Sequence, residues 1–325
     1  MRSIHRLLAV AVAALTFAGT AGAASAQTAD DGTSTATSST SSTSSYGRDG
    51  GRDRDRDRVV VYGLTTGQRI VTFPLDRPAQ LQRVVDVKGL SRGEKLIGID
   101  RRPLDGQVYG LVRSRFGARL VTVDPGTGRT RRVATLVSAP TATSPNRTPV
   151  VLSGWEFGVD FNPAADAFRI VSDTGQNLRV IPSPRTAPDG TMLQTGDTFT
   201  DGTLNRAGVT AMGVTGAAYT NNDNDPATAT TLYDIDAWRD ELVVQNPPNA
   251  GTLVNPLPLE RRTMQAVGFD IRTTAGAGDL AVASLTGGSM FWPTSSLFVV
   301  DLTTGDLDRQ GVFPYAVLRD IALAG

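Results

Sequence analysis

A unit of four short apolar or alternating segments recurs along the sequence, and this repeat restricts the chain to a small set of folds. Its clearest copy spans residues 96–136, where we expect strands at 96–100, 107–112, 118–124 and 130–136. The segments are separated by Gly, Pro, Asn and Asp, which favour turns. Because no long helical pattern interrupts them, the sequence predicts an all-β fold of repeated antiparallel units.

The first strand of this unit occurs five times. Its copies lie near Asp100, Asp160, Tyr219, Asp270 and Asp320. Five first strands predict a β-propeller with five four-stranded blades. A sixth blade would require a divergent strand pair within residues 189–209.

The two ends of the repeat region complete each other. Residues 59–73 and 81–87 resemble the third and fourth strands of a unit, whereas residues 317–323 resemble a first strand. Neither end makes a full unit, but joined they would make one. We therefore expect a closed ring over residues 59–325, in which the C-terminal strand joins the N-terminal blade and protects its edge.

Residues 1–26 have the features of a secretory signal peptide. Arg2 and Arg6 precede an apolar run, and the small residues at 24–26 form a cleavage pattern. Residues 27–58 are rich in Ser and Thr and then alternate Arg with Asp, so they have little to bury. We expect a disordered linker acting as a solvated spacer rather than a contact with wall polymer, because its alternating charges cancel. The sequence thus predicts a secreted or periplasmic protein with no membrane span after cleavage.

The residue types that are missing exclude several kinds of chemistry. The sequence has no cysteine, and its only histidine, His5, lies in the predicted signal peptide. Ser-His-Asp and Cys-His catalysis, disulfides, and the usual zinc, copper and His-ligated haem sites are therefore excluded from the mature chain. The 32 basic and 32 acidic side chains balance, so no nucleic-acid partner is expected. Carboxylates, hydroxyls and hard cations bound by oxygen remain.

The ends of the first strands carry the main candidate site. In a propeller these strands line the central channel, and their polar residues should meet at one mouth of it. The candidate ligand-binding residues are Asp100, Asp160, Asn162, Asn221, Asn222, Asp270 and Asp320. Together they could hold Ca²⁺, which takes six to eight oxygen ligands, or bind a polyol or sugar. The favoured alternative is that each side chain satisfies the backbone of its own turn.

Two further segments are candidates. Residues 220–231 are dense in oxygen ligands but lack the spacing of an EF-hand, which favours a plain polar loop. Met290, Phe291 and Trp292 should lie on the opposite rim. There they could contact a partner or glycan, or they could instead pack between blades.

Several motifs resemble a known family. "GVDFNP", "RIVSDTGQNLRV", "AYTNN", "TTLYDID" and "NPPNAGTL" occur in an order similar to that in a bacterial family called domain of unknown function 4394. The resemblance covers residues 59–325. It implies a propeller-like fold and no particular activity.

These observations favour an exported, non-catalytic binding or scaffolding propeller whose partner is a protein or glycan of the cell envelope. The alternative is a Ca²⁺-dependent hydrolase or lyase of carbohydrates or lactones, with the carboxylates at the channel mouth. Calcium is the one cofactor that the sequence suggests.

Overall fold

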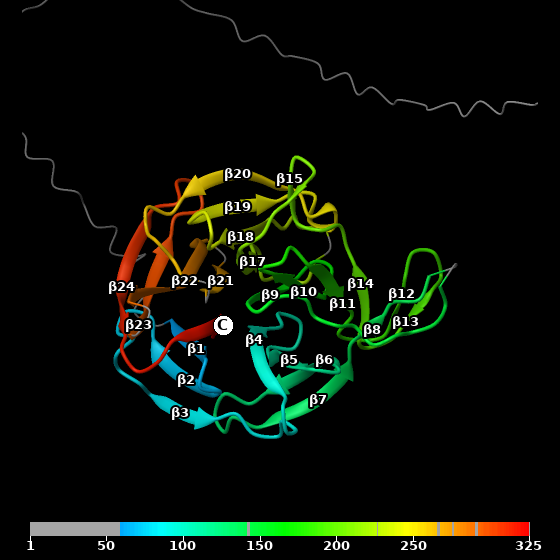
Figure 1. Ribbon diagram of the computed structural model, residues 1–325, viewed down its shortest axis with the longest axis horizontal. Helices are drawn as coiled ribbons and strands as arrows, with labels where there is room; N and C mark the ends of the chain where they lie inside the picture. Colours follow the sequence, from blue (N-terminus) through cyan, green and yellow to red (C-terminus); the bar gives the residue numbers. More distant parts are fainter. Residues whose placement is uncertain are drawn as a thin grey trace, which may run out of the picture. The chain divides into compact units, whose positions relative to one another are not determined.

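Five antiparallel four-stranded arrangements form the folded part of the chain, and they are placed around a central axis (Figure 1). The structure, a computed structural model, describes residues 59–141, 144–225, 227–264, 267–274, 276–289 and 292–324. The predicted signal peptide and linker, residues 1–58, lie outside these ranges. Within the ranges, no helix is long and apolar enough to cross a membrane.

Each blade has four main strands, which follow one another from the centre of the ring outward. Blade 1 contains β25 (Leu318–Leu323), β1 (Val60–Thr65), β2 (Arg69–Pro74) and β3 (Arg83–Asp86). Blade 2 contains β4 (Lys95–Arg101), β5 (Val108–Ser114), β6 (Gly117–Val123) and β7 (Thr130–Thr135). Blade 3 contains β9 (Phe157–Asn162), β10 (Ala167–Ser172), β11 (Asn177–Val180) and β14 (Asp197–Thr200), with β8 (Val137–Ser138) added at its edge. Blade 4 contains β17 (Val214–Tyr219), β18 (Leu232–Asp236), β19 (Glu241–Gln245) and β20 (Leu253–Pro258). Blade 5 contains β21 (Val267–Thr274), β22 (Gly278–Ser289), β23 (Trp292–Val300) and β24 (Leu307–Phe313).

The ring is closed as the sequence predicts. The C-terminal strand β25 pairs antiparallel with β1, with Gly63 opposite Ile321 and Val61 opposite Leu323. The red C-terminal strand therefore lies beside the blue N-terminal strands in Figure 1. Because this pairing supplies the inner strand of blade 1, the fold is a closed five-bladed β-propeller.

The observed strands differ from the predicted ones in two places. Residues 59–73 hold two strands, β1 and β2, rather than one third strand, because a tight turn with Gln68 at a φ of 61° reverses the chain. Residues 189–209 do not form a sixth blade. They hold β14, the outer strand of blade 3, and parts of two short hairpins, β12 (Arg185–Thr186) with β13 (Met192–Leu193) and β15 (Asn205–Arg206) with β16 (Val209–Thr210).

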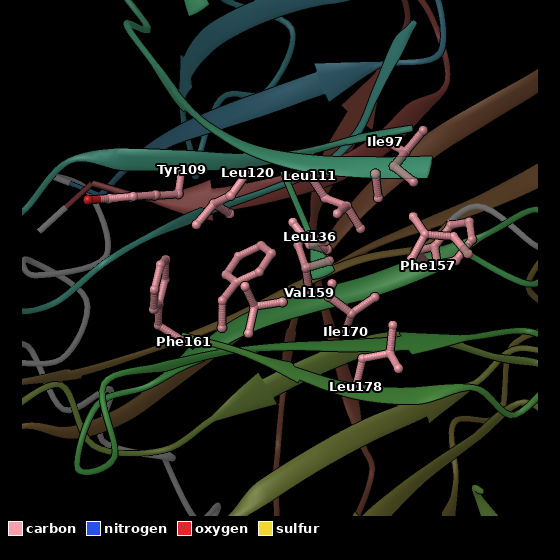
Figure 2. Packing of buried hydrophobic residues seen from close by; sticks show 14 residues of the cluster. Ile97, Tyr109, Leu111, Leu120, Leu136, Phe157, Val159, Phe161, Ile170 and Leu178 are labelled. Atoms are coloured by element: carbon pink, nitrogen blue, oxygen red, sulfur yellow. The ribbon is translucent and has the colours of Figure 1, made fainter. Parts of the chain in front are cut away.

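Apolar side chains from facing sheets fill the space between blades. Figure 2 shows the cluster between blades 2 and 3, where Ile97 and Leu111 face Val159 and Ile170. Burying a side chain of this size stabilises the fold by about 1.5–3 kcal/mol. Since each blade buries one face against each neighbour, the ring holds together by packing without disulfides.

The inner strands approach each other so closely that only glycine fits at certain positions. A Cβ at Gly158 would lie 2.6 Å from the main chain of Ala217 in blade 4, and one at Gly268 would lie 2.7 Å from Ile321 N in blade 1. Both distances are too short for a carbon atom, so a larger residue would push the strands apart. This close approach brings the polar residues that follow the glycines to the channel axis.

Candidate functional site

Four of the inner strands carry a buried aspartate that hydrogen-bonds to the next blade. We call these four residues the interblade aspartates. The bonds run from Ile99 N to Asp320 Oδ2 (2.8 Å), Phe161 N to Asp100 Oδ2 (2.7 Å), Tyr219 N to Asp160 Oδ2 (2.8 Å) and Leu323 N to Asp270 Oδ2 (2.6 Å). The inner strands of different blades do not hydrogen-bond to each other as neighbouring strands of one sheet do. A main-chain N–H group that faces the neighbouring blade therefore needs another acceptor, and each of these carboxylates supplies one.

Asn222 closes the remaining junction, between blades 4 and 5. In blade 4 the residue two positions after the inner-strand glycine, Gly216, is Ala218, which has no carboxylate. Thr273 N instead donates to Asn222 Oδ1, and Asn221 N donates to Thr273 Oγ1 at 2.7 Å. All five junctions around the channel are thus closed by a bond between a side chain and the main chain.

Replacing Asp320 tests this role. Asp320→Ala leaves the buried N–H groups of Ile99 and Ile321 without an acceptor, so we expect a loss of about 1–3 kcal/mol in unfolding free energy. Asp320→Asn keeps an acceptor oxygen in the same place and should lose clearly less. Urea unfolding at pH 5 measures both variants, and equal losses would show that the interblade bond contributes nothing.

A cavity of about 380 Å³ opens at the channel mouth, and three of the interblade aspartates line it. One oxygen from each of Asp100, Asp160 and Asp270 lies within 4.8 Å of the others. Arg101 and Arg272 flank these carboxyl groups in the cavity wall. We call this space the channel-mouth cavity. It combines buried acceptors with cationic donors, as polar binding sites do.

Burial controls the protonation of these carboxyl groups. It raises the pKa of Asp100 and Asp160 well above the ordinary range, and the charges of neighbouring aspartates raise both further. The carboxyl groups of Asp100 and Asp160 also lie close enough to influence each other's pKa directly. Burial raises the pKa of Asp270 to about 6, while main-chain N–H donors and the two arginines oppose the shift. Burial therefore favours the neutral form of Asp100 and Asp160, whereas the two arginines favour the charged form of Asp270.

The predicted residues do not all meet at the cavity. Asp100, Asp160, Asp270 and Asn222 line it, whereas Asp320, Asn162 and Asn221 do not. Burial raises the pKa of Asp320 well above its usual value. The turn interpretation is correct for Asn162, whose Oδ1 accepts from Ala165 N, and for Asn221, whose Oδ1 accepts from Asp223 N. It is incomplete for the interblade aspartates, because each of them accepts a bond from another blade. Asp100 and Asp320 also accept from the N–H of the residue that follows them in the chain.

The two other candidate segments contribute nothing to this cavity beyond Asn222. In residues 220–231, the carboxylates of Asp223 and Asp225 accept N–H groups of their own loop, as expected of a polar loop. Trp292 begins β23 and is 81% exposed, so it does not pack between blades. Met290 and Phe291 lie outside the described residues.

Sequence reasoning missed a buried arginine between blades 3 and 4. Arg169 on β10 is 2% exposed and donates to Asp201 Oδ2 (2.7 Å), Asn177 Oδ1 (2.8 Å), Asn249 Oδ1 (2.9 Å) and the Tyr219 hydroxyl (3.2 Å). It therefore links four separate segments. The only signal in the sequence is an arginine inside an otherwise apolar strand.

It also missed Asp234 on β18, a buried acid. Neither carboxylate oxygen of Asp234 has a hydrogen-bond partner among the described residues. Burial raises its pKa to about 8, and the positive charge of Arg169 only partly opposes this shift. Asp234 is therefore mostly neutral at pH 7.

The solved structures that resemble this chain share little of its sequence. No curated protein matches the sequence. A chain of the nidogen/laminin complex is 14% identical over 82% of this chain and 98% of its own, with a TM-score of 0.43. A protein from Lactobacillus plantarum is 10% identical over 82% of this chain and 99% of its own, with a TM-score of 0.34. An auxiliary nutrient binding protein from Bacteroides ovatus is 14% identical over 69% of this chain and 55% of its own, with a TM-score of 0.36.

These structural scores are too low to support a functional argument. The family comparison is different, because one model matches residues 69–322, most of the propeller. That match confirms the resemblance carried by the motifs around Asp160 and Tyr219. The chain belongs to the family described as domain of unknown function (DUF4394).

Proposed function

We propose that this chain is an exported, non-catalytic binding propeller whose ligand enters the channel-mouth cavity. The observation that carries the proposal is the convergence of Asp100, Asp160 and Asp270 with Arg101 and Arg272 around about 380 Å³ of space. Carboxylates accept hydrogen bonds from hydroxyl groups, and guanidinium groups donate to ether or carbonyl oxygens. A hydroxyl-rich molecule such as a saccharide fits this mixture.

The location of the binding partner follows from the N-terminal sequence. Residues 1–26 have the pattern of a signal peptide, and residues 27–58 that of a spacer. We propose that the propeller is secreted or periplasmic and binds a glycan or protein of the cell envelope. No nucleic-acid partner is proposed.

Thermal unfolding in the presence of ligands tests this function. A panel of glycerol, galactose, glucose and galacturonate at millimolar concentration should contain at least one compound that raises the Tm. A ligand at one hundred times its Kd adds about 2.7 kcal/mol, which is a shift of several degrees.

Two matched variants locate the effect. Asp270→Asn removes a charge from the cavity wall and should abolish the ligand-induced shift. Asp320→Asn makes the same chemical change at an interblade aspartate outside the cavity and should keep the shift. A shift that survives Asp270→Asn, or a panel without any shift, contradicts the proposal.

A second candidate function is favoured by the 4.8 Å grouping of the three carboxylate oxygens. We infer that this group could hold Ca²⁺ and serve a hydrolase or lyase of carbohydrates or lactones. Asp100, Asp160 and Asp270 would be its ligands, and each would have to lose its proton to bind the ion, against the raised pKa that burial gives them. Calcium should then raise the Tm more at pH 8 than at pH 5.5, and a chelator should reverse this. No calcium effect at either pH removes this candidate.

A further inference from the structure

A second cavity adjoins the channel mouth on the same face of the propeller. It has a volume of about 330 Å³ and lies between blades 1 and 2, with Tyr62 contributed by β1. Three arginines line it: Arg101, Arg129 and Arg131. We call it the arginine cavity. Arg101 also lines the channel-mouth cavity, so a single side chain borders both spaces.

These three arginines are not neutralised by contact with a carboxylate. Across the described ranges, none of their guanidinium groups makes a salt bridge or a side-chain hydrogen bond. Several other arginines of the propeller do pair with an acid. Arg102, Arg119 and Arg169 each contact a carboxylate at 2.5–2.7 Å.

One carboxylate, Asp124, lies in the wall of the arginine cavity, but its oxygens are already engaged. Its Oδ1 accepts from Gly126 N at 2.8 Å and its Oδ2 from the Thr127 hydroxyl at 2.9 Å. These bonds belong to the turn between β6 and β7. The charged groups in the wall therefore carry three positive charges against one negative charge.

The guanidinium group of Arg101 lies against the turn at Gly106, at the boundary between the two cavities. A Cβ at Gly106 would lie 2.9 Å from Arg101 Nη2, and Gly106 has a φ of 69°, which disfavours other residues. The backbone conformation thus favours glycine at this turn, beside the guanidinium group of Arg101. Planar guanidinium groups bind carboxylate and phosphate oxygens with paired hydrogen bonds.

We propose that the arginine cavity binds the oxyanion of an acidic ligand, a carboxylate or phosphate group, while the hydroxyl-bearing part of that ligand lies in the channel-mouth cavity. This inference rests on the proposed function and narrows its ligand class to acidic saccharides and sugar phosphates. Arg101 contacts both parts of the ligand. Arg129 and Arg131 select for the anionic group.

Calorimetric titration of the full mature protein tests the proposal with three probes: galacturonate, galactose and inorganic phosphate. Arg129→Ala with Arg131→Ala should weaken galacturonate and phosphate binding at least tenfold and leave galactose binding unchanged, because each lost contact is a charge-assisted hydrogen bond. Arg132→Ala is the matched control, since Arg132 follows Arg131 on β7 but does not line this cavity.

The outcomes separate this inference from the proposed function. Galacturonate binding that is unchanged in the double variant overturns the inference, as does an equal loss for galactose. If no sugar binds but phosphate binds wild type and not the double variant, the oxyanion site is supported and the channel-mouth function is overturned. If phosphate and galacturonate both fail to bind wild type, the inference is overturned, whatever galactose does.

Discussion

Denaturant unfolding of the protein is expected to show stability that falls as pH rises from 5 to 9. No histidine lies among residues 59–325, so histidine titration cannot produce this change. The buried carboxyl groups produce it, because burial raises the pKa of Asp234 to about 8 and that of Asp270 to about 6. An acid of this kind contributes its full stability below the pKa that it has in the unfolded state, which is near 4. This contribution is lost as pH rises through the higher pKa that it has in the folded state.

Asp234 accounts for one defined part of the effect, to which the raised pKa values of Asp100, Asp160 and Asp320 add. A rise from 3.8 to about 8 is about four pKa units, which corresponds to about 5 kcal/mol across the whole window. Asp234→Asn removes the titrating group without changing the shape of the side chain. The variant should match wild type near pH 4 and be more stable by about 4 kcal/mol at pH 8.

A matched control separates the effect of burying the carboxyl group from the effect of replacing Asp by Asn. Asp306→Asn makes the same substitution at an exposed residue and should leave the pH dependence as in wild type. A wild-type stability that is flat between pH 5 and 9, or an Asp234→Asn profile parallel to that of wild type, contradicts the assignment.

Removing Arg169 is expected to destabilise the propeller by about 3–5 kcal/mol, as for other buried charge pairs that lose one member. In Arg169→Leu, the nearly buried Asp201 loses its 2.7 Å contact, and the side chains of Asn177 and Asn249 lose a donor. The four segments of blades 3 and 4 that Arg169 links then lack their common partner. Urea unfolding at pH 7 measures the loss.

Arg179→Leu is the control for that experiment. Arg179 also contacts Asp201, at 3.1 Å, but its side chain is 27% exposed, and such pairs contribute at most about 1 kcal/mol. The two variants should therefore differ by at least about 2 kcal/mol. Similar losses in both would mean that the burial of Arg169 adds nothing to its pairing with Asp201.

The sequence predicts the ring well, because the signals for it are repetitive and local. Alternating segments and turn residues recur with each blade, and residues 317–323 supply the strand that residues 59–87 lack. Even so, the hairpin that reverses at Gln68 is not predicted, although the polar residues 65–69 interrupt the apolar run there.

The candidate site is predicted only in part, because the sequence shows each residue with its chain neighbours alone. Asp100 precedes a proline by three residues and therefore resembles a turn residue, yet its hydrogen-bond donor, Phe161 N, lies 61 residues further along the chain. Asp234 lies in a strand that alternates polar with apolar residues, a pattern typical of a strand with one solvated face. In a propeller both faces of the strand are covered, so this carboxyl group is buried.

The sequence also does not show which arginines line the two cavities. Sequence alone cannot distinguish Arg101, which borders both cavities, from Arg102, which pairs with Asp166 at 2.5 Å. The two residues are adjacent, but β4 ends at Arg101 and Arg102 begins the turn that follows, so their side chains lie in different surroundings. Only the arrangement of blades shows which arginine is available to a ligand.

A crystal structure of the protein soaked with the saccharide that raises its Tm most tests the central claim directly. We expect electron density for that ligand in the channel-mouth cavity, with hydroxyl oxygens within hydrogen-bond distance of Asp160 and Asp270. If the ligand carries an oxyanion, this group should lie beyond Arg101, toward Arg129 and Arg131. Density for the ligand elsewhere on the propeller, with only water at the three aspartates, would contradict the claim.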